Sequence, residues 1–220
     1  TLMRDERLRQ VVELALARNR DLRVALLNVE RSRAQLRLTD ADRWPTVSAA
    51  FIASRAPNAQ GDQANTLQLG LQLRSYEIDL LGRLSNASDA SASTLLATEA
   101  GARSARLALV AQAASAWLTL AADGEQLTLA RQSLQSRDET LRLTALRESA
   151  GAASALELSV AQSLSASARA SVAQLERQLA QDRSALSLVA GGELPAALLP
   201  GATALSEGDW LAAVPVGASS

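Results

Sequence analysis

The spacing of apolar residues at the start of the chain predicts a helix. From about Asp5 to Asp42, apolar residues recur at intervals of three and four, with arginine and glutamate between them. These apolar positions are Leu8, Val11, Val12, Leu14, Ala15, Leu22, Ala25, Leu26, Val29, Ala34 and Leu36. Residues 19–21 mark a local break. The element ends before Pro45, because proline disfavours the helical conformation at Trp44.

Two strands are predicted next, because the apolar period changes from helical to alternating. In TVSAAFIASRAP, one face carries Val47, Ala49, Phe51 and Ala53, and Ile52 is an exception on the other face. In TLQLGLQLRSY, one face carries only Leu67, Leu69, Leu71 and Leu73. Its other face carries Gln68, Gly70, Gln72 and Arg74. The polar loop NAQGDQAN joins the two strands into a β-hairpin.

The pattern leaves two interpretations of this hairpin. Its strands are about 10 to 12 residues long, which matches the roughly 9 to 11 residues of a tilted strand that crosses a bilayer. An amphipathic hairpin that lies on the helices of a soluble protein is the commoner case. A lone hairpin is only marginally stable in water, however, and the sequence shows no other convincing strand. Partner strands would therefore come from further sequence or from other subunits.

A much longer helix is predicted after the hairpin. It starts between Leu80 and Asn86 and continues to Ser149 without a proline, with glycine only at positions 101 and 124. At about 1.5 Å per residue, such a helix is a rod of roughly 100 Å. An apolar seam with seven-residue spacing runs along it, through Ala113, Leu120, Leu127, Leu134 and Leu141.

The chain then reverses and the seven-residue spacing returns. One position of the repeat holds Leu158, Ser165, Val172, Leu179 and Leu186. The other holds Ala161, Ala168, Leu175 and Val189, with Asp182 as an interruption. These seams predict an antiparallel coiled-coil hairpin with its tip near residues 150–154. At the tip, Gly151 suits a left-handed helix end, and Ser154 forms a capping box with Glu157.

The predicted fold class is mainly α with a β-hairpin, in four segments. Residues 1–45 form an N-terminal helical segment, 46–77 the β-hairpin, 78–190 the coiled-coil hairpin and 191–220 a connector. The connector is rich in proline, glycine and alanine and has one short predicted helix near Ser206 to Ala213. We expect the natural polypeptide to continue beyond it.

Composition excludes several classes of function. The chain has 22 basic and 23 acidic residues, a net charge of −1 and no basic stripe, which argues against nucleic-acid binding. It has no histidine and no cysteine, which removes disulfides, thiol nucleophiles, imidazole bases and the commonest zinc ligands. We therefore predict no enzyme activity, no cofactor and no metal site.

Several residues that suggest chemistry have a structural explanation. Glu77 and Asp79 are expected to cap the long helix, because the helix dipole favours negative charge at that end. Trp117 is expected in the core. The apolar run 107–122 is shorter than the roughly 20 residues of a membrane-spanning helix and is predicted as a buried bundle helix. No signal peptide opens the chain, which predicts a cytosolic protein or a targeting segment already removed.

The order of these elements and several local motifs resemble the TolC-like outer-membrane efflux proteins. Residues 19–23, NRDLR, resemble the Asn-x-Asp-Leu-Arg signature of that family, and ADRWPTVS resembles the entry into its first barrel strand. YEIDLLGRL, residues 76–84, resembles the Trp-Glu-Leu-Asp-Leu-Phe-Gly-Arg segment that starts the long helix. VPVGASS resembles the run before the family's second repeat. The resemblance covers the whole chain but only about the first half of a family protomer.

The tip of the coiled coil also resembles the family. Its pattern is Arg-x-x-x-Gly-Leu-x-Ser-x-Leu-Asp-Val, which Arg147, Gly151, Ser154 and Leu156 match. Ala152 stands where the family usually has leucine, and Glu157 where it usually has aspartate. The resemblance implies that Arg147, Gly151, Ala152 and Ser154 touch a periplasmic adaptor protein.

The resemblance implies an efflux channel in the outer membrane and periplasm of a Gram-negative bacterium. Three protomers would share one transmembrane β-barrel and a periplasmic tunnel, and would work with the adaptor and an inner-membrane transporter to export small molecules such as drugs. Many family members are lipoproteins, and the acylated cysteine would lie upstream of Thr1. In the barrel, Leu67, Leu69, Leu71 and Leu73 would face lipid, and Gln68, Gln72 and Arg74 the lumen. Trp44 and Tyr76 suit the membrane interface or plain packing equally.

A soluble coiled-coil scaffold or adaptor with no transport role is the competing hypothesis. It explains the seven-residue spacing of the long helices. It does not explain the strand length, the all-leucine face or the ordered motifs.

Overall fold

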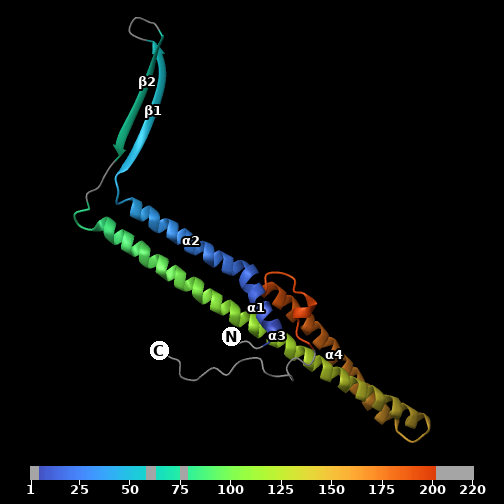
Figure 1. Cartoon of the computed structure of the whole chain (residues 1–220). Coiled ribbons are helices and arrows are strands. Elements are labelled where there is room, and N and C mark those ends of the chain that lie inside the picture. Colours follow the sequence, from blue (N-terminus) through green and yellow to red (C-terminus); the bar gives the residue numbers. More distant parts are fainter. Residues whose placement is uncertain (1–4, 58–62, 75–78, 202–220) are drawn as a thin grey trace, which may run out of the picture. The chain divides into compact units, whose positions relative to one another are not determined.

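A computed structural model describes residues 5–57, 63–74 and 79–201, with only the backbone of Ala64 and Arg74 (Figure 1). The described chain is mostly helical and has one two-stranded antiparallel sheet, which confirms the predicted fold class. It divides into two compact units, whose boundaries fall after Arg23 and after Arg103. The predicted helix at 206–213, the run VPVGASS, Glu77 and Tyr76 lie outside the described residues.

The N-terminal helical pattern forms two helices, as the predicted break requires. Helix α1 is Glu6–Arg18 and helix α2 is Arg20–Ala41. Asn19 lies between them, and its side-chain amide makes two hydrogen bonds. Its Oδ1 accepts a hydrogen bond from the backbone N–H of Leu22 at 3.0 Å, and its Nδ2 donates to the carbonyl of Val189 at 3.0 Å. Asn19 therefore caps α2 and also ties this break to the end of α4 (Ala155–Val189).

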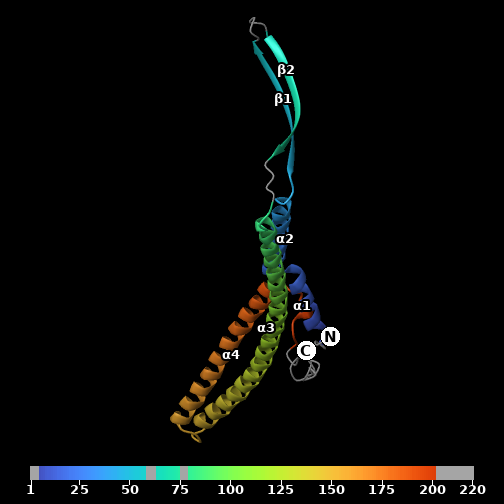
Figure 2. The same cartoon turned by 90° about the vertical axis from the view of Figure 1, so that its left-hand side faces the viewer.

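The unit of residues 24–103 contains most of α2, the β-hairpin and the start of helix α3 (Arg83–Ser149). Strand β1 is Thr46–Pro57 and strand β2 is Gln63–Arg74. Figures 1 and 2 both show α2 lying along the first part of α3. Arg33 and Glu99 form an ion pair at 3.0 Å between these helices, and Ser88 donates a hydrogen bond to Asp40.

The second unit contains α1, the rest of α3 and α4, which folds back along α3 (Figure 2). The predicted seam is confirmed, because its residues are buried or half-buried while most residues between them are exposed. Among them, Ala113, Leu120, Leu127, Ala161, Val172 and Leu186 are buried. Ser165 is a buried polar residue of the seam and donates a hydrogen bond to Asp138 of α3.

Where α1 meets α3 and α4, the seam widens into a hydrophobic core. Its members from α1 are Leu8, Val11, Val12 and Ala15, and those from the other elements include Leu109, Ala113, Trp117, Leu120, Leu186 and Leu194. Trp117 is fully buried, as predicted, and its indole N–H donates to the carbonyl of Leu198 at 3.0 Å. Leu198 ends a short 3₁₀ helix, η1 (Ala196–Leu198), which the sequence did not predict.

Length and composition alone would allow α3 to cross a membrane. Its residues Leu109, Ala113 and Trp117 instead contribute to the core, in agreement with the predicted bundle helix.

Helix α4 ends in close contact with the end of α1 at Gly191. Gly191 has φ of +77°, and its N–H bonds to the carbonyl of Leu188 while that of Gly192 bonds to Ser187. This is a Schellman ending, which favours glycine at the left-handed position. A Cβ atom on Gly191 would lie 2.5 Å from the carbonyl oxygen of Arg18, so only glycine fits here.

Candidate functional site

One face of the β-hairpin is apolar over four consecutive pairs, from Val47 to Ala53 on β1 and from Leu67 to Leu73 on β2, before Arg55 and Asn65 continue it. The pairing sets Val47 opposite Leu73, Ala49 opposite Leu71, Phe51 opposite Leu69 and Ala53 opposite Leu67. Since side chains on paired residues of a sheet point to the same face, these eight residues form one ladder. Leu69 is 83% exposed and Leu71 is 82% exposed. The sequence predicted the apolar positions of both strands, and the register sets the two sets opposite each other on one face.

The other face of the hairpin is mostly polar. Ser48 pairs with Gln72 and donates a hydrogen bond to its carbonyl at 3.3 Å. Ile52 pairs with Gln68 and is the large apolar exception on this face. The predicted lumen-facing residues Gln68 and Gln72 therefore share one face, whereas the side chain of Arg74 lies outside the described residues. No described side chain of either strand is buried, so each face is available to a partner.

The segments on either side of the hairpin hold the interfacial candidate and the predicted cap. Trp44 precedes β1 and is 74% exposed. Asp79 caps α3: its Oδ2 accepts a hydrogen bond from the backbone N–H of Ser85 at 2.9 Å. This bond and those from the N–H groups of Leu84 and Arg83 lower the pKa of Asp79. Asp79 is thus a structural carboxylate, as predicted.

The turn between α3 and α4 contains the other predicted site residues. Gly151 has φ of +71°, and the N–H of Ala152 bonds to the carbonyl of Arg147 at 2.7 Å, again a Schellman ending. The Arg147 guanidinium donates back to the carbonyl of Ala152 at 3.2 Å. The structure therefore brings Arg147, Gly151 and Ala152 together in one exposed turn.

Ser154 starts α4 with the predicted capping box. Its Oγ accepts a hydrogen bond from the N–H of Glu157 at 3.2 Å, and the Glu157 carboxylate accepts from the N–H of Ser154 at 2.7 Å. This backbone hydrogen bond is the main reason that the pKa of Glu157 is lowered. The negative charge of Glu157 is therefore held at the start of a helix, where the helix dipole favours it.

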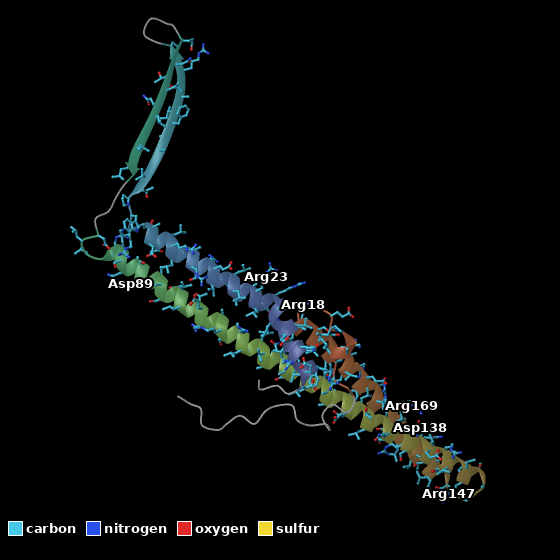
Figure 3. All side chains as sticks on the ribbon, viewed as in Figure 1. Arg18, Arg23, Asp89, Asp138, Arg147 and Arg169 are labelled. Carbon is cyan, nitrogen blue, oxygen red and sulfur yellow. The ribbon has the colours of Figure 1, made fainter. Side chains whose placement is uncertain are left out.

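Two features near the turn were not predicted. Leu146 and Leu156, which flank the turn in the sequence, are 55% and 74% exposed. Further along the hairpin, Asp138 of α3 accepts hydrogen bonds from Ser165 and from Arg169, the latter at 3.3 Å (Figure 3). The seven-residue spacing signals which residues lie in the seam, but it gives no signal for which polar groups pair across it.

The described residues contain no candidate metal site. No group of three or more acidic, histidine or cysteine side chains gathers there in a way that would hold a metal ion. The two candidate sites offer binding surfaces instead. One is a bare apolar ladder, and the other is an exposed helical turn.

Sequence comparison finds similar proteins. The family model described as outer membrane efflux protein matches residues 11–192. The outer membrane protein OprJ of Pseudomonas aeruginosa is 39% identical over 203 residues, which cover 89% of this chain and 42% of OprJ. The toluene efflux pump outer membrane protein TtgC of Pseudomonas putida is 37% identical over 224 residues, which cover 98% of this chain and 46% of TtgC. The chain thus spans less than half the length of these relatives.

Solved structures share the fold. A crystal structure of a membrane protein from Pseudomonas aeruginosa matches with a TM-score of 0.80 and 39% identity, covering 90% of this chain and 48% of that protein. A structure of CusC matches with a TM-score of 0.78 and 32% identity, covering 91% of this chain and 46% of that protein.

Proposed function

The chain belongs to the outer membrane efflux protein family, and we propose that it forms part of the outer-membrane channel of a tripartite efflux pump. In this function the channel is a passive exit duct for small molecules and has no catalytic role. The apolar ladder of the β-hairpin is the observation that carries the proposal. The competing scaffold hypothesis leaves this ladder without a purpose.

The ladder fits a membrane better than it fits water. Six of its members are large, namely Val47, Phe51, Leu67, Leu69, Leu71 and Leu73, and each is more than 60% exposed. Contact with lipid removes this apolar surface from water, which is favourable by about 25 cal/mol for each Å² removed. Both strands have 12 residues, enough to cross a bilayer at a tilt.

Two strands cannot close a barrel, so the hairpin must share its edges with other strands. The chain spans less than half the length of its relatives. We propose that further strands come from the rest of the polypeptide and from two more copies of it. In the closed barrel, Leu67, Leu69, Leu71 and Leu73 face lipid, and Gln68, Gln72 and Arg74 face a water-filled lumen.

Site-directed spin labels test these two faces. A label in place of Leu69 should collide with oxygen dissolved in lipid, and a label in place of Gln72 should collide with a water-soluble nickel complex. The two positions lie three residues apart on one strand, so their depths differ by at most about 10 Å. The opposite accessibilities, or water access at both positions, would exclude the barrel.

The helices then form the periplasmic tunnel, and the turn at Gly151 is the contact for the adaptor. Exposure of Arg147, Ala152 and Ser154 supports this assignment, and the apolar side chain of Leu156 adds contact area. Two hydrogen bonds between Arg147 and Ala152 hold the turn in one shape before any partner binds. A preformed turn loses little conformational entropy when it docks. The adaptor in turn connects the channel to an inner-membrane transporter.

Substitution at the turn tests the adaptor contact separately. Ala152→Trp should reduce efflux at least tenfold while the channel still assembles, because the indole fills the space that the partner occupies. Ala166→Trp, on an exposed position of α4 away from the turn, is the matched control. Unchanged efflux in an assembled Ala152→Trp channel would remove the turn from the contact.

A further inference from the structure

Two aspartates occupy one layer of the seam between α3 and α4. Asp123 lies three residues after Leu120 and four before Leu127, both buried seam residues of α3. Asp182 lies three residues after Leu179 and four before Leu186 on α4. This spacing places both carboxyl groups at inward positions. The sequence shows Asp182 as an interruption, and the structure shows that its counterpart is a second acid.

The two carboxyl groups touch each other. The side chains of Asp123 and Asp182 share a hydrogen bond across the seam. The Nε2 of Gln178 donates to both carboxyl oxygens of Asp182, at 3.1 Å each. A hydrogen bond between two carboxyl groups needs one proton, because two carboxylates have no donor. That hydrogen bond, burial and the charge of Asp182 raise the pKa of Asp123 to about 6.

The charged side chains around this layer form ion pairs with other residues or line a groove beside the layer. Arg131 and Glu176 pair with each other at 2.7 Å, and they line this groove with Arg183 and Gly124. From α1, Arg7 reaches the same groove at Gly201, and it pairs with Asp5 at 3.2 Å. Glu125 follows on α3 and has an interaction of its own. In the part of the chain that the structure describes, neither Asp123 nor Asp182 has an ion-pair partner.

We propose that Asp123 and Asp182 form a proton-sensitive latch between the two helices of the coiled-coil hairpin. In mildly acidic medium one shared proton joins α3 to α4 at this layer. Near neutral pH the proton leaves, two carboxylates face each other in the seam, and their repulsion separates the helices locally. The latch concerns the hairpin itself and does not depend on the proposed efflux function.

The composition of the chain makes this latch unusually easy to test. It has no histidine and no cysteine, so side chains with ordinary pKa values do not titrate between pH 5 and pH 8. Asp5 and Glu157 have lowered pKa values and titrate below this range. Among the side chains of this chain, a transition near pH 6 therefore points to this pair, and the variant Asp123→Asn assigns it in the whole protein.

Spin labels measure the separation of the helices directly. Gln126 of α3 and Gln181 of α4 are exposed and lie within three residues of the two aspartates, so labels there report on this layer. In the whole protein, we expect a narrow distance distribution at pH 5 and a broader, longer one at pH 8, with half of the change near pH 6. In the variant Asp123→Asn the distance distribution should stay narrow at both pH values. The amide of the new asparagine donates to Asp182 without a titrating proton.

Asp89→Asn, at an exposed position of α3 in the other unit, is the control and should keep the wild-type pH dependence. A wild-type distance that does not change between pH 5 and pH 8 would overturn the latch, as would a change that persists in Asp123→Asn. Carbon-13 NMR of labelled aspartate provides a second measurement that needs no variant. A carboxyl resonance with a midpoint near pH 6 supports the latch, and titration of every aspartate near pH 4 contradicts it.

Discussion

The β-hairpin and the helical hairpin share an antiparallel arrangement, but only the helical hairpin buries its apolar residues. Each consists of two antiparallel elements with a regular apolar stripe. In the helical hairpin the stripe is buried, as at Leu120, Leu127 and Val172. In the β-hairpin it is bare, with Leu69 and Leu71 more than 80% exposed.

Geometry explains the difference. Two helices cover each other's stripes because their side chains interlock across the seam. Two strands side by side in one sheet leave a face that neither can cover, because hydrogen bonds join the strands edge to edge. The helical hairpin is therefore stable through contacts within the described chain, and the β-hairpin requires an apolar partner outside it.

The largest expected effect comes from the core of the helical unit. Trp117→Ala should lower the free energy of unfolding by about 3 to 5 kcal/mol, because it leaves a large cavity and removes the hydrogen bond to Leu198. Urea unfolding followed by circular dichroism measures this loss. Trp44→Ala is the matched control, since Trp44 is exposed and its removal should stay within about 0.5 kcal/mol. Equal losses would mean that the helical unit has no core of its own.

The next effect concerns the bare stripe and should appear only in a bilayer. Leu69→Arg places a charge on the proposed lipid face and should destabilise the inserted protein by about 2 to 4 kcal/mol. Gln68→Arg, one residue earlier and on the opposite face, should cost far less. The fraction of folded protein in lipid vesicles at graded urea concentrations gives both values. Similar costs at the two positions would mean that the hairpin has no lipid side.

A smaller effect is expected where α4 ends against α1. Gly191→Ala should lower the free energy of unfolding by about 1 to 3 kcal/mol, because alanine is strained at this φ and its Cβ would collide with Arg18. Gly192→Ala serves as the control, since a Cβ there meets nothing within 4 Å. Urea unfolding distinguishes the two. A neutral Gly191→Ala would show that this junction is looser than the structure indicates.

The smallest effect concerns the capping box at the tip. Ser154→Ala should cost about 1 kcal/mol by removing a helix cap, and Ser159→Ala on the same helix should cost less. The lowered pKa of Glu157 adds a pH dependence. Its contribution is present above its ordinary value of 4.5 and is lost as the pH falls through the lowered value. Amide hydrogen exchange in the first turn of α4 measures the loss of the cap and its pH dependence. Exchange rates that Ser154→Ala does not change would contradict the role of the cap.

Local chemistry made much of this structure predictable. The breaks at Asn19 and Gly151, the ends of the long helices and the cap at Ser154 depend on residues that act within one helical turn. The alternation of leucine and glutamine likewise fixes the two faces of β2. Contacts between distant segments were not predictable in the same way. Nothing in the local sequence indicates that Asn19 bonds to Val189, or that Trp117 bonds to Leu198 beside an unpredicted 3₁₀ helix.

The sequence by itself determined which residues face inward, because the apolar period of a helix or strand is a property of that segment alone. Only the tertiary structure decided which inward residues meet. It set Asp123 against Asp182, Ser165 against Asp138, and Phe51 against Leu69. The physical reason is that periodicity specifies a face but not a register, and register follows from the packing of whole elements. The apolar face of the hairpin could therefore be predicted from the sequence, whereas the acidic pair in the seam could be identified only from the tertiary structure.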